Sequence, residues 1–299
     1  MSHSPTAHVH PGASIAAGAQ LGDFVVVYPG ASVGEGCRVR GFTQIWPGVQ
    51  LQDGAEIGPG VTIEAPVAES SDIVVGAGVK VGAGALICRG VRIGQGAEVA
   101  AGAVVAQNVP PYAIVAGSPA RVVNYVQQAE AESPADWHPI ATFPESPSTM
   151  RLGVGDVTLH RFKSVRDPRG DLSVGEFSRE IPFVPKRYFL VMNVPNDKTR
   201  GEHAHYRCHQ FLVCVKGSCA VVVDDLHSRC EVRLESPDQG LYLPPMTWGI
   251  QYKYSSDAVM MVFASEYYEA DDYIRDYDEF VTAKRRMEAQ DNNHSLESA

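Results

Sequence analysis

Two histidines in the second half of the chain have a spacing that suits proton transfer. His203 and His205 are separated by one residue, and His209 follows four residues later. Side chains two apart on a β-strand project from the same face, so a strand here would bring both imidazoles into one site. Imidazole exchanges protons near neutral pH without adjustment of its pKa, as a general acid–base catalyst requires. The alternative is a set of surface histidines on an edge strand, and for His209 both interpretations stay open.

The sequence after residue 151 predicts the strands that would position these histidines. Short apolar runs alternate with turn signals, among them Lys216-Gly217 and Asp224-Asp225, which are typical of tight hairpins. The predicted strands cover residues 188–193, 209–215, 219–223, 230–234, 240–243 and 258–263. Strands of this length and spacing predict a jelly-roll β-barrel over residues 151–285.

The segment 200–217 resembles the first cupin motif, in which His-x-His is followed by an acidic residue and a glycine. In metal-binding cupins these groups and a histidine of the second motif hold the ion. Here Gln210 replaces the acidic residue, and Trp248 and Gly249 occupy the region of the last histidine. Two neutral imidazoles alone make a poor divalent site, so we expect no metal.

A closer resemblance covers residues 155–283. The motifs are Arg200-Gly-Glu-His-Ala-His, Gly240-Leu-Tyr-Leu-Pro-Pro-Met-Thr-Trp, Asp167-Pro-Arg-Gly-Asp-Leu and the tyrosine-rich segment 264–280. They are similar to those of the sugar 3,4-ketoisomerases of the WxcM-like cupin family. The resemblance implies isomerisation of dTDP-4-keto-6-deoxyglucose through an enediol, without a cofactor, in unusual-sugar synthesis for surface polysaccharide. It also implies a cupin dimer that exchanges N-terminal strands.

This resemblance also implies a role for individual residues. His205 is the expected base for the carbon-bound proton, and His203 moves or stabilises the proton between the two oxygens. Arg187 and Arg200 match positions near the nucleotide diphosphate, where guanidinium groups suit the charge. The further candidates for substrate contact are Arg169, Gln210, Tyr268 and Trp248. The two aromatic residues among them could equally belong to the core.

The first half of the chain is a six-residue repeat. Every sixth residue from Val9 to Val105 is a branched aliphatic except Glu69, which falls in the loop 65–72, and glycine often follows the aliphatic. Neither a helix nor a simple strand has this period, whereas a parallel β-helix with glycine-relieved turns does. We therefore predict an all-β protein with a β-helix over residues 1–126, a linker at 127–150, the barrel, and a polar tail at 286–299.

The end of the repeat resembles that of the left-handed β-helix, hexapeptide-repeat acyltransferases. The most specific part is Gly117-Ser-Pro-Ala-Arg121, and the resemblance implies acyl-CoA bound partly against Gly117, Ser118, Pro119 and Arg121. It implies trimeric coils and acetyl transfer from acetyl-CoA to a dTDP-3-amino-3,6-dideoxyhexose. These enzymes usually present a histidine as base, but no histidine lies between His10 and His138. The weak substitutes are Glu64, Glu69 and Asp72, and an inert trimerisation scaffold is the alternative.

Composition limits the remaining function classes. The net charge of −10 argues against binding to nucleic acid or to an anionic membrane. The N-terminus has neither a basic start nor a hydrophobic core, so we expect no signal peptide, and six cysteines without disulfide-framework spacing favour the cytoplasm. The sequence predicts a bifunctional homo-oligomer, which is a hexamer if trimer and dimer contacts both form. An isomerase without transferase activity and a non-catalytic sugar-nucleotide-binding cupin stay as alternatives.

Overall fold

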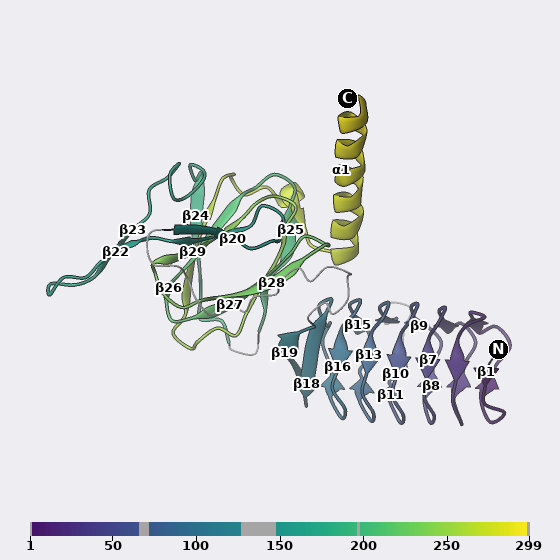
Figure 1. The fold of residues 1–299 in the computed structure, drawn as a ribbon. Helices are drawn as coiled ribbons and strands as arrows, with labels where there is room; N and C mark the ends of the chain where they lie inside the picture. Colours follow the sequence, from purple (N-terminus) through teal and green to yellow (C-terminus); the bar gives the residue numbers. More distant parts are fainter. Residues whose placement is uncertain (1, 66–71, 127–147, 196–197, 298–299) are drawn as a thin grey trace. The chain divides into compact units, whose positions relative to one another are not determined.

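The computed structural model describes residues 2–65, 72–126, 148–195 and 198–297. The chain divides into two compact units, Met1–Val126 and Gln127–Ala299. Both are built from strands, with one α-helix, α1 (Tyr277–Glu297), among the described residues (Figure 1). The predicted all-β class is confirmed, but α1 takes in most of the predicted polar tail. No helix in the described part of the chain has the length and apolar character of a membrane span.

The first unit is a parallel β-solenoid of short strands (Figure 1). Each strand pairs with the one a full coil further along, as when Gln20 lies beside Arg38 and Leu21 beside Val39. The strands of one face are β1 (Ser2–His3), β4 (Gln20–Leu21), β7 (Arg38–Val39), β10 (Glu56–Ile57), β13 (Lys80–Val81) and β16 (Glu98–Val99). The second face has β2 (His8–Val9), β5 (Val26–Val27), β8 (Gln44–Ile45), β11 (Thr62–Ile63), β14 (Leu86–Ile87) and β17 (Val104–Val105). The third has β3 (Ser14–Ile15), β6 (Ser32–Val33), β9 (Val49–Leu51), β12 (Ile73–Val75) and β15 (Arg92–Ile93).

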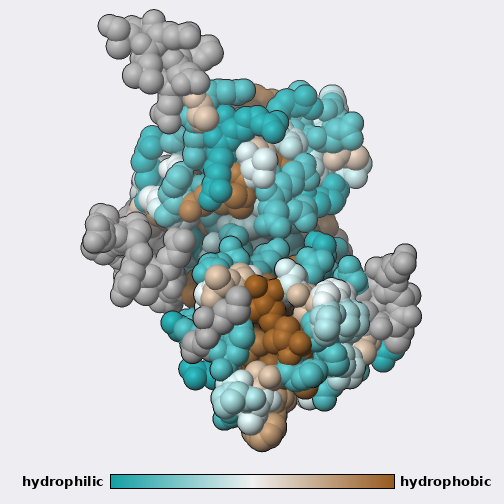
Figure 2. Space-filling model, turned by 90° about the vertical axis from the view of Figure 1, so that its right-hand side faces the viewer, coloured by the Kyte–Doolittle hydropathy of each residue, from teal (hydrophilic) through white to brown (hydrophobic). Residues whose placement is uncertain are grey.

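The predicted aliphatic ladder fills the solenoid interior. Val27 and Ile45 have no exposed surface, and the residues two positions earlier, such as Val25, are equally buried. Val9 is 38% exposed because the first coil is covered from one side only, and Figure 2 shows a hydrophobic patch on the end of the solenoid that carries the N-terminus. The mismatch at Glu69 also has a structural reason. Ile57 pairs with Val81, which is six residues beyond the usual interval, so the insertion is one repeat long and the register resumes after it.

The glycines that follow the ladder residues serve close packing between coils. A side chain at Gly82 would place its Cβ 2.4 Å from the backbone nitrogen of Ala101 on the next coil, and Gly58 is similarly confined. The positive-φ turn positions are two residues later, for example Gly84 with φ of 65°. Glycine thus relieves the turn backbone at these later positions, as expected, whereas at the ladder-following positions the close approach of the next coil excludes a side chain.

A β-hairpin closes the solenoid. β18 (Ala113–Gly117) pairs in parallel with β16 on one side and antiparallel with β19 (Ala120–Tyr125) on the other. The predicted CoA-binding residues Gly117, Ser118, Pro119 and Arg121 occupy the tip of this hairpin, where Gly117 has φ of 98° and the Ser118–Pro119 bond is cis. The predicted linker 127–150 lies mostly outside the described residues, although its last residues belong to a strand of the second unit.

The second unit is a barrel of two antiparallel sheets. One contains β20 (Ser148–Arg151), β21 (Thr158–Arg161), β29 (Gln239–Leu243), β26 (Gln210–Lys216), β31 (Val259–Ala264) and β24 (Arg187–Met192), in that order. The other contains β28 (Arg229–Leu234), β27 (Cys219–Asp224), β30 (Trp248–Tyr252), β25 (Arg200–His205) and β32 (Tyr273–Ile274). Leu212 and Leu241 of the first sheet share a hydrophobic core with Val221 and Val232 of the second. A separate hairpin, β22 (Lys163–Val165) and β23 (Leu172–Val174), extends away from the barrel (Figure 1).

Candidate active site

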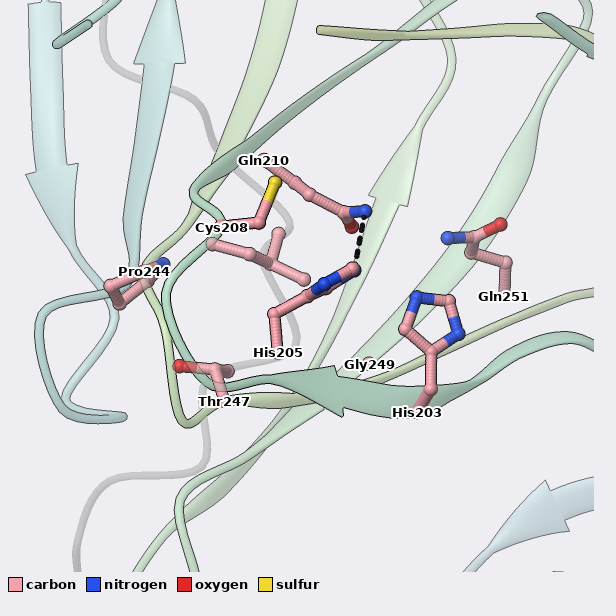
Figure 3. A pocket seen from close by; sticks show the side chains of 9 residues that line it. His203, His205, Cys208, Gln210, Pro244, Thr247, Gly249 and Gln251 are labelled. Atoms are coloured by element: carbon pink, nitrogen blue, oxygen red, sulfur yellow. Dashed lines mark hydrogen bonds between the residues drawn. The ribbon is translucent and has the colours of Figure 1, made fainter. Parts of the chain in front are cut away.

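A small pocket opens inside the barrel of the second unit. His203 and His205 of β25 line it, with Gln210 of β26 and Gln251 of β30 (Figure 3). Strand β25 carries a register shift between Gly201 and His203. Such a bulge re-aims the side chains that follow it. The two imidazole centres lie 5.0 Å apart, so the structure brings the predicted histidine pair into one cavity.

Hydrogen bonds on both ring nitrogens hold the His205 imidazole. Its Nδ1 lies 2.9 Å from Oδ2 of Asp272, and its Nε2 lies 3.0 Å from the amide nitrogen of Gln210. An amide nitrogen can only donate and a carboxylate can only accept, so the proton is on Nδ1 and the lone pair is on Nε2. Backbone N–H groups of Arg207 and Cys208 donate to the same carboxylate and fix its position. His205 is therefore a base oriented by a carboxylate, and its lone pair is on Nε2, where it accepts from the Gln210 amide.

The histidines are not at their ordinary pKa. Burial lowers the pKa of His205 to about 4, with a further lowering from His203, although Asp272 opposes the shift. Burial also lowers the pKa of His203, against a backbone hydrogen bond to Gly201 that favours the protonated ring. Our expectation of untuned imidazoles was wrong, because the barrel removes both rings from water. Both side chains are neutral at pH 7, which is the form a general base requires.

Arg187 connects the histidine pair to the outer part of the site. Its Nη2 lies 3.3 Å from the Tyr273 hydroxyl, and the Tyr273 ring centre lies 4.2 Å from that of His205. The Arg187 guanidinium also lies 5.4 Å from the centre of the Tyr268 ring, which is 61% exposed. The arrangement offers a cation and two aromatic rings next to the acid–base pair, suited to a ligand that carries both an anionic group and a planar ring.

The described residues include one group with the composition of a metal site. Ligand atoms of His205, Cys208 and Asp272 all lie within 4.8 Å of one another. The carboxylate already accepts from His205 and from two backbone N–H groups, and the Cys208 thiol donates to the carbonyl of His209 at 3.4 Å. Hydrogen bonds thus use the potential ligand atoms, and the donor set does not require a cation.

We therefore expect the second unit's activity to be independent of divalent cations. Dialysis against a strong chelator should leave the turnover rate unchanged, because the groups that hold His205 in place are protein groups. The measurement is the initial rate of the isomerisation expected from the sequence, before and after dialysis. The metal content of each sample is determined by mass spectrometry. A loss of rate that zinc or another divalent cation restores would contradict the expectation.

Comparison with known proteins agrees with this geometry. Residues 155–285 match the family described as FdtA, WxcM-like, C-terminal. The TDP-4-oxo-6-deoxy-alpha-D-glucose-3,4-oxoisomerase of Aneurinibacillus thermoaerophilus is 45% identical over 119 residues, which are 40% of this chain and 86% of the relative. The chain belongs to the WxcM-like family.

Two solved structures are each similar to part of the chain. QdtA, a sugar 3,4-ketoisomerase from Thermoanaerobacterium thermosaccharolyticum in complex with TDP, has a TM-score of 0.43 and 35% identity, over 44% of this chain and 96% of that one. A mutant of the perosamine N-acetyltransferase from Caulobacter crescentus in complex with CoA and GDP-perosamine has a TM-score of 0.38 and 22% identity, over 42% of this chain and 57% of that one.

Of the six predicted contact residues of the WxcM-like unit, Gln210 alone lines this pocket. Arg187 and Tyr268 lie next to it, and the other three do not line it. Trp248 is 3% exposed and packs on Tyr277 and Phe280 of α1. It does not line the pocket, because Gly249 and Gln251 do so and side chains alternate along β30. Of the two readings that the sequence left open for Trp248, the structure favours a place in the core. The Arg200 side chain is exposed at the start of β25. Arg169 sits between β22 and β23, 90% exposed and paired with Asp167.

His209 is also outside the pocket lining. Its Nδ1 lies 2.6 Å from the Tyr242 hydroxyl, its backbone N–H donates to Ser265, and burial lowers its pKa. The ring is half-buried, so His209 is a structural residue beside the site.

Asp272 and Gln251 were not predicted from the sequence. Asp272 stands in the tyrosine-rich segment that carries the WxcM-like resemblance, but several acidic residues surround it there and none is distinguished by spacing. Gln251 is two residues beyond Gly249, so strand alternation from the second cupin motif could have placed it in the pocket.

The solenoid presents weaker candidates for chemistry. The Glu64 carboxylate accepts hydrogen bonds from the backbone and guanidinium of Arg89, and these contacts hold its pKa below the ordinary value. A carboxylate stabilised in this way is a poorer base. Asp72 is exposed at the end of the insertion, and Glu69 lies outside the described residues, as do His138 and Trp137.

Proposed function

We propose that the second unit is a sugar-nucleotide 3,4-ketoisomerase that acts on dTDP-4-keto-6-deoxyglucose. The observation that carries the proposal is His205, a buried, neutral imidazole whose Nδ1 proton is held by Asp272 and whose Nε2 lone pair faces a pocket. The similarity to an oxoisomerase of this specificity supports the substrate class. Arg187 is the proposed partner of the diphosphate, with Tyr268 beside it at the rim.

The proposed reaction moves two protons and needs no external oxidant or reductant. His205 Nε2 removes the proton at carbon 3, after the Gln210 amide has moved off this nitrogen, and an enediolate forms. His203 takes the proton from the oxygen at carbon 3 and returns it to the oxygen at carbon 4. The His205 imidazolium then protonates carbon 4, so the ketone has moved to carbon 3. The two carbons exchange oxidation states within the molecule.

A deuterium experiment tests this function against the non-catalytic binding module. The protein is incubated with dTDP-4-keto-6-deoxyglucose in deuterated water, and both ketosugars are followed by NMR. An isomerase incorporates deuterium at carbon 4 of the 3-keto product, since the enediolate is protonated from solvent-exchanged His205. Unlabelled, unchanged substrate in the presence of tight nucleotide binding would identify a binding module.

For the first unit we propose acetyl-CoA-dependent N-acetylation of a dTDP-3-amino-3,6-dideoxyhexose. The support is the solenoid with its closing hairpin, which carries the Gly117–Arg121 motif at its tip. An inert scaffold is the second candidate, favoured by the ion pair that occupies Glu64 and by the missing histidine. In the proposed order of reactions the isomerase acts before an amine-forming step and the transferase acts after it. We propose the cytoplasm as the compartment, since all six cysteines are free thiols.

We expect the full-length protein to bind CoA. Titration calorimetry should detect binding that Arg121→Glu weakens at least about tenfold, because reversing the charge near the CoA phosphates costs on the order of 1.4 kcal/mol or more. Arg40→Glu, an exposed charge reversal on another coil, should leave the affinity unchanged. If wild type gives no heat with CoA, the first unit is a structural scaffold.

We also propose a homo-oligomer with a trimeric solenoid and a dimeric barrel. Light scattering of the intact chain should give a hexamer if both contacts form in one particle. The outer face of β24 supports a barrel contact, since Tyr188, Leu190 and Met192 are 65%, 40% and 45% exposed on this edge strand. A monomer at micromolar concentration would refute both contacts.

A further inference from the structure

Gln251 is a pocket residue to which the chemistry above gives no part. It lies in β30, a central strand whose backbone pairs at this position with Arg200 of β25 and Val221 of β27. Its side chain is 7% exposed and lines the cavity with both histidines. The position is rigid, because sheet hydrogen bonds hold the strand from both sides.

A buried tyrosine fixes which end of the Gln251 amide faces the pocket. The Tyr254 hydroxyl donates to Oε1 of Gln251 at 2.9 Å, and Tyr254 is 1% exposed. Burial raises the pKa of this phenol, so it remains a donor throughout the physiological range. Since Oε1 is held by Tyr254, the amide nitrogen is turned toward the cavity (Figure 3). No hydrogen bond joins this nitrogen to another of the described residues.

The proposed reaction needs a donor at this place. Negative charge develops on the carbonyl oxygen at carbon 4 as the enediolate forms. His205 is occupied with the carbon-bound proton. His203 is neutral, because burial lowers its pKa, and in the proposed reaction it is occupied with the hydroxyl proton at carbon 3. Figure 3 shows the Thr247 oxygen directed away from the two histidines.

We infer that Gln251 is a catalytic residue, whose amide N–H donates a hydrogen bond to the carbonyl oxygen at carbon 4 as it becomes an enediolate oxygen. The inference rests on the proposed ketoisomerase function and deepens it. When His205 Nε2 takes the carbon 3 proton, the C–H electron pair forms the double bond between carbons 3 and 4. The carbonyl π pair moves onto the oxygen, and no further reactant is consumed.

Tyr254 is then a positioning residue that acts through Gln251. A preorganised donor of this kind stabilises the transition state more than the bound ketone. Removal of the donor should lower kcat by about 10²–10³-fold, and it should change KM by no more than about twofold. Loss of the tyrosine hydroxyl frees the amide to rotate and should lower kcat less, by about tenfold.

The experiment compares Gln251→Leu, Tyr254→Phe and Tyr252→Phe with wild type in the full-length protein. Isomerisation of dTDP-4-keto-6-deoxyglucose gives kcat and KM, calorimetry with TDP gives nucleotide affinity, and circular dichroism checks folding. Tyr252→Phe is the matched control, because it also removes the hydroxyl of a buried tyrosine near Gln251, one that contacts Glu231 and not the pocket. The double variant Gln251→Leu/Tyr254→Phe removes both partners of the buried hydrogen bond and decides the question if Gln251→Leu does not fold.

The supporting result is a large fall in kcat for Gln251→Leu, an intermediate fall for Tyr254→Phe, unchanged TDP affinity and normal Tyr252→Phe. If wild type turns over and a folded Gln251 variant, single or double, keeps the full kcat, Gln251 does not have the proposed role. The isomerase function then still stands. A wild-type protein without turnover overturns the isomerase function, and the role of Gln251 with it.

Discussion

Replacement of His205 by asparagine is expected to abolish isomerisation, with kcat lower by at least about 10²–10⁴-fold. The amide side chain can still donate toward Asp272, but it carries no nitrogen lone pair that could remove a carbon-bound proton. Among the described residues His203 is the only other imidazole that lines the pocket, and in the proposed reaction it carries the hydroxyl proton. Deuterium incorporation at carbon 4 should fall in the same proportion as turnover, because both pass through the enediolate.

The matched control is His209→Asn. His209 undergoes the same chemical change four residues further on, but it is bound to Tyr242 and lies outside the pocket lining. This variant should retain most of the activity, and TDP affinity should be unchanged in both. Substantial turnover by His205→Asn would contradict the assignment of the base, whereas equal losses in the two variants would indicate a folding defect.

Replacement of Asp272 by asparagine is expected to lower kcat by about 10²–10⁴-fold, because His205 would then adopt the tautomer that cannot act as the base. An asparagine amide can donate to Nδ1, which then places the imidazole proton on Nε2, where the base must accept. The analogous exchange in the Ser-His-Asp triad costs about 10⁴-fold for this reason. The backbone N–H groups of Arg207 and Cys208 would also lose a charged acceptor, so thermal stability should be measured in parallel.

The pH profile separates this role from a purely structural one. His205 is in its base form above a pKa of about 4, so wild-type kcat/KM should stay level on the acid side until the pH approaches that value. Asp272 raises the pKa of His205, and its removal should therefore shift the acid limb to lower pH while the plateau falls. Asp271→Asn, at the exposed neighbouring residue, should change neither. An acid limb that stays in place in Asp272→Asn would exclude control of His205 by this carboxylate.

Much of the fold follows from local pattern. The six-residue period could be read because each ladder residue is buried against the same residue type of the next coil, so the pattern repeats without interruption except at the one-repeat insertion. The barrel strands 219–223 and 230–234 were predicted within one residue of β27 and β28, since their apolar positions and turn signals are local. The helix α1 was missed because its sequence is polar and has no apolar stripe. Its buried aromatic residues, Tyr277 and Phe280, lie in its first turn.

The site was only partly predictable, and the reason is distance along the chain. His203 and His205 share a strand, so their common face follows from alternation. Their partners do not: Asp272 comes from 67 residues further on, and Tyr254 acts on the pocket only through Gln251. The shifted pKa values depend on burial in the complete barrel, which no short motif encodes. For Trp248 the sequence left pocket and core open, because the cupin motif fixes its place on β30 but not which face of the strand meets the cavity.

The contact between His205 and Asp272 has a consequence for the order in which the enzyme matures. Tyr273 and Ile274 form β32, a two-residue strand at the edge of its sheet that pairs with β25 at Ala204 and His205. A growing polypeptide presents both histidines long before it presents Asp272, the carboxylate that selects the working tautomer of His205. An edge pairing this short also opens at small free-energy cost. Amide exchange at Tyr273 should be faster than in β26 or β27, and a transient release of this one strand would silence the base while the rest of the barrel stays folded.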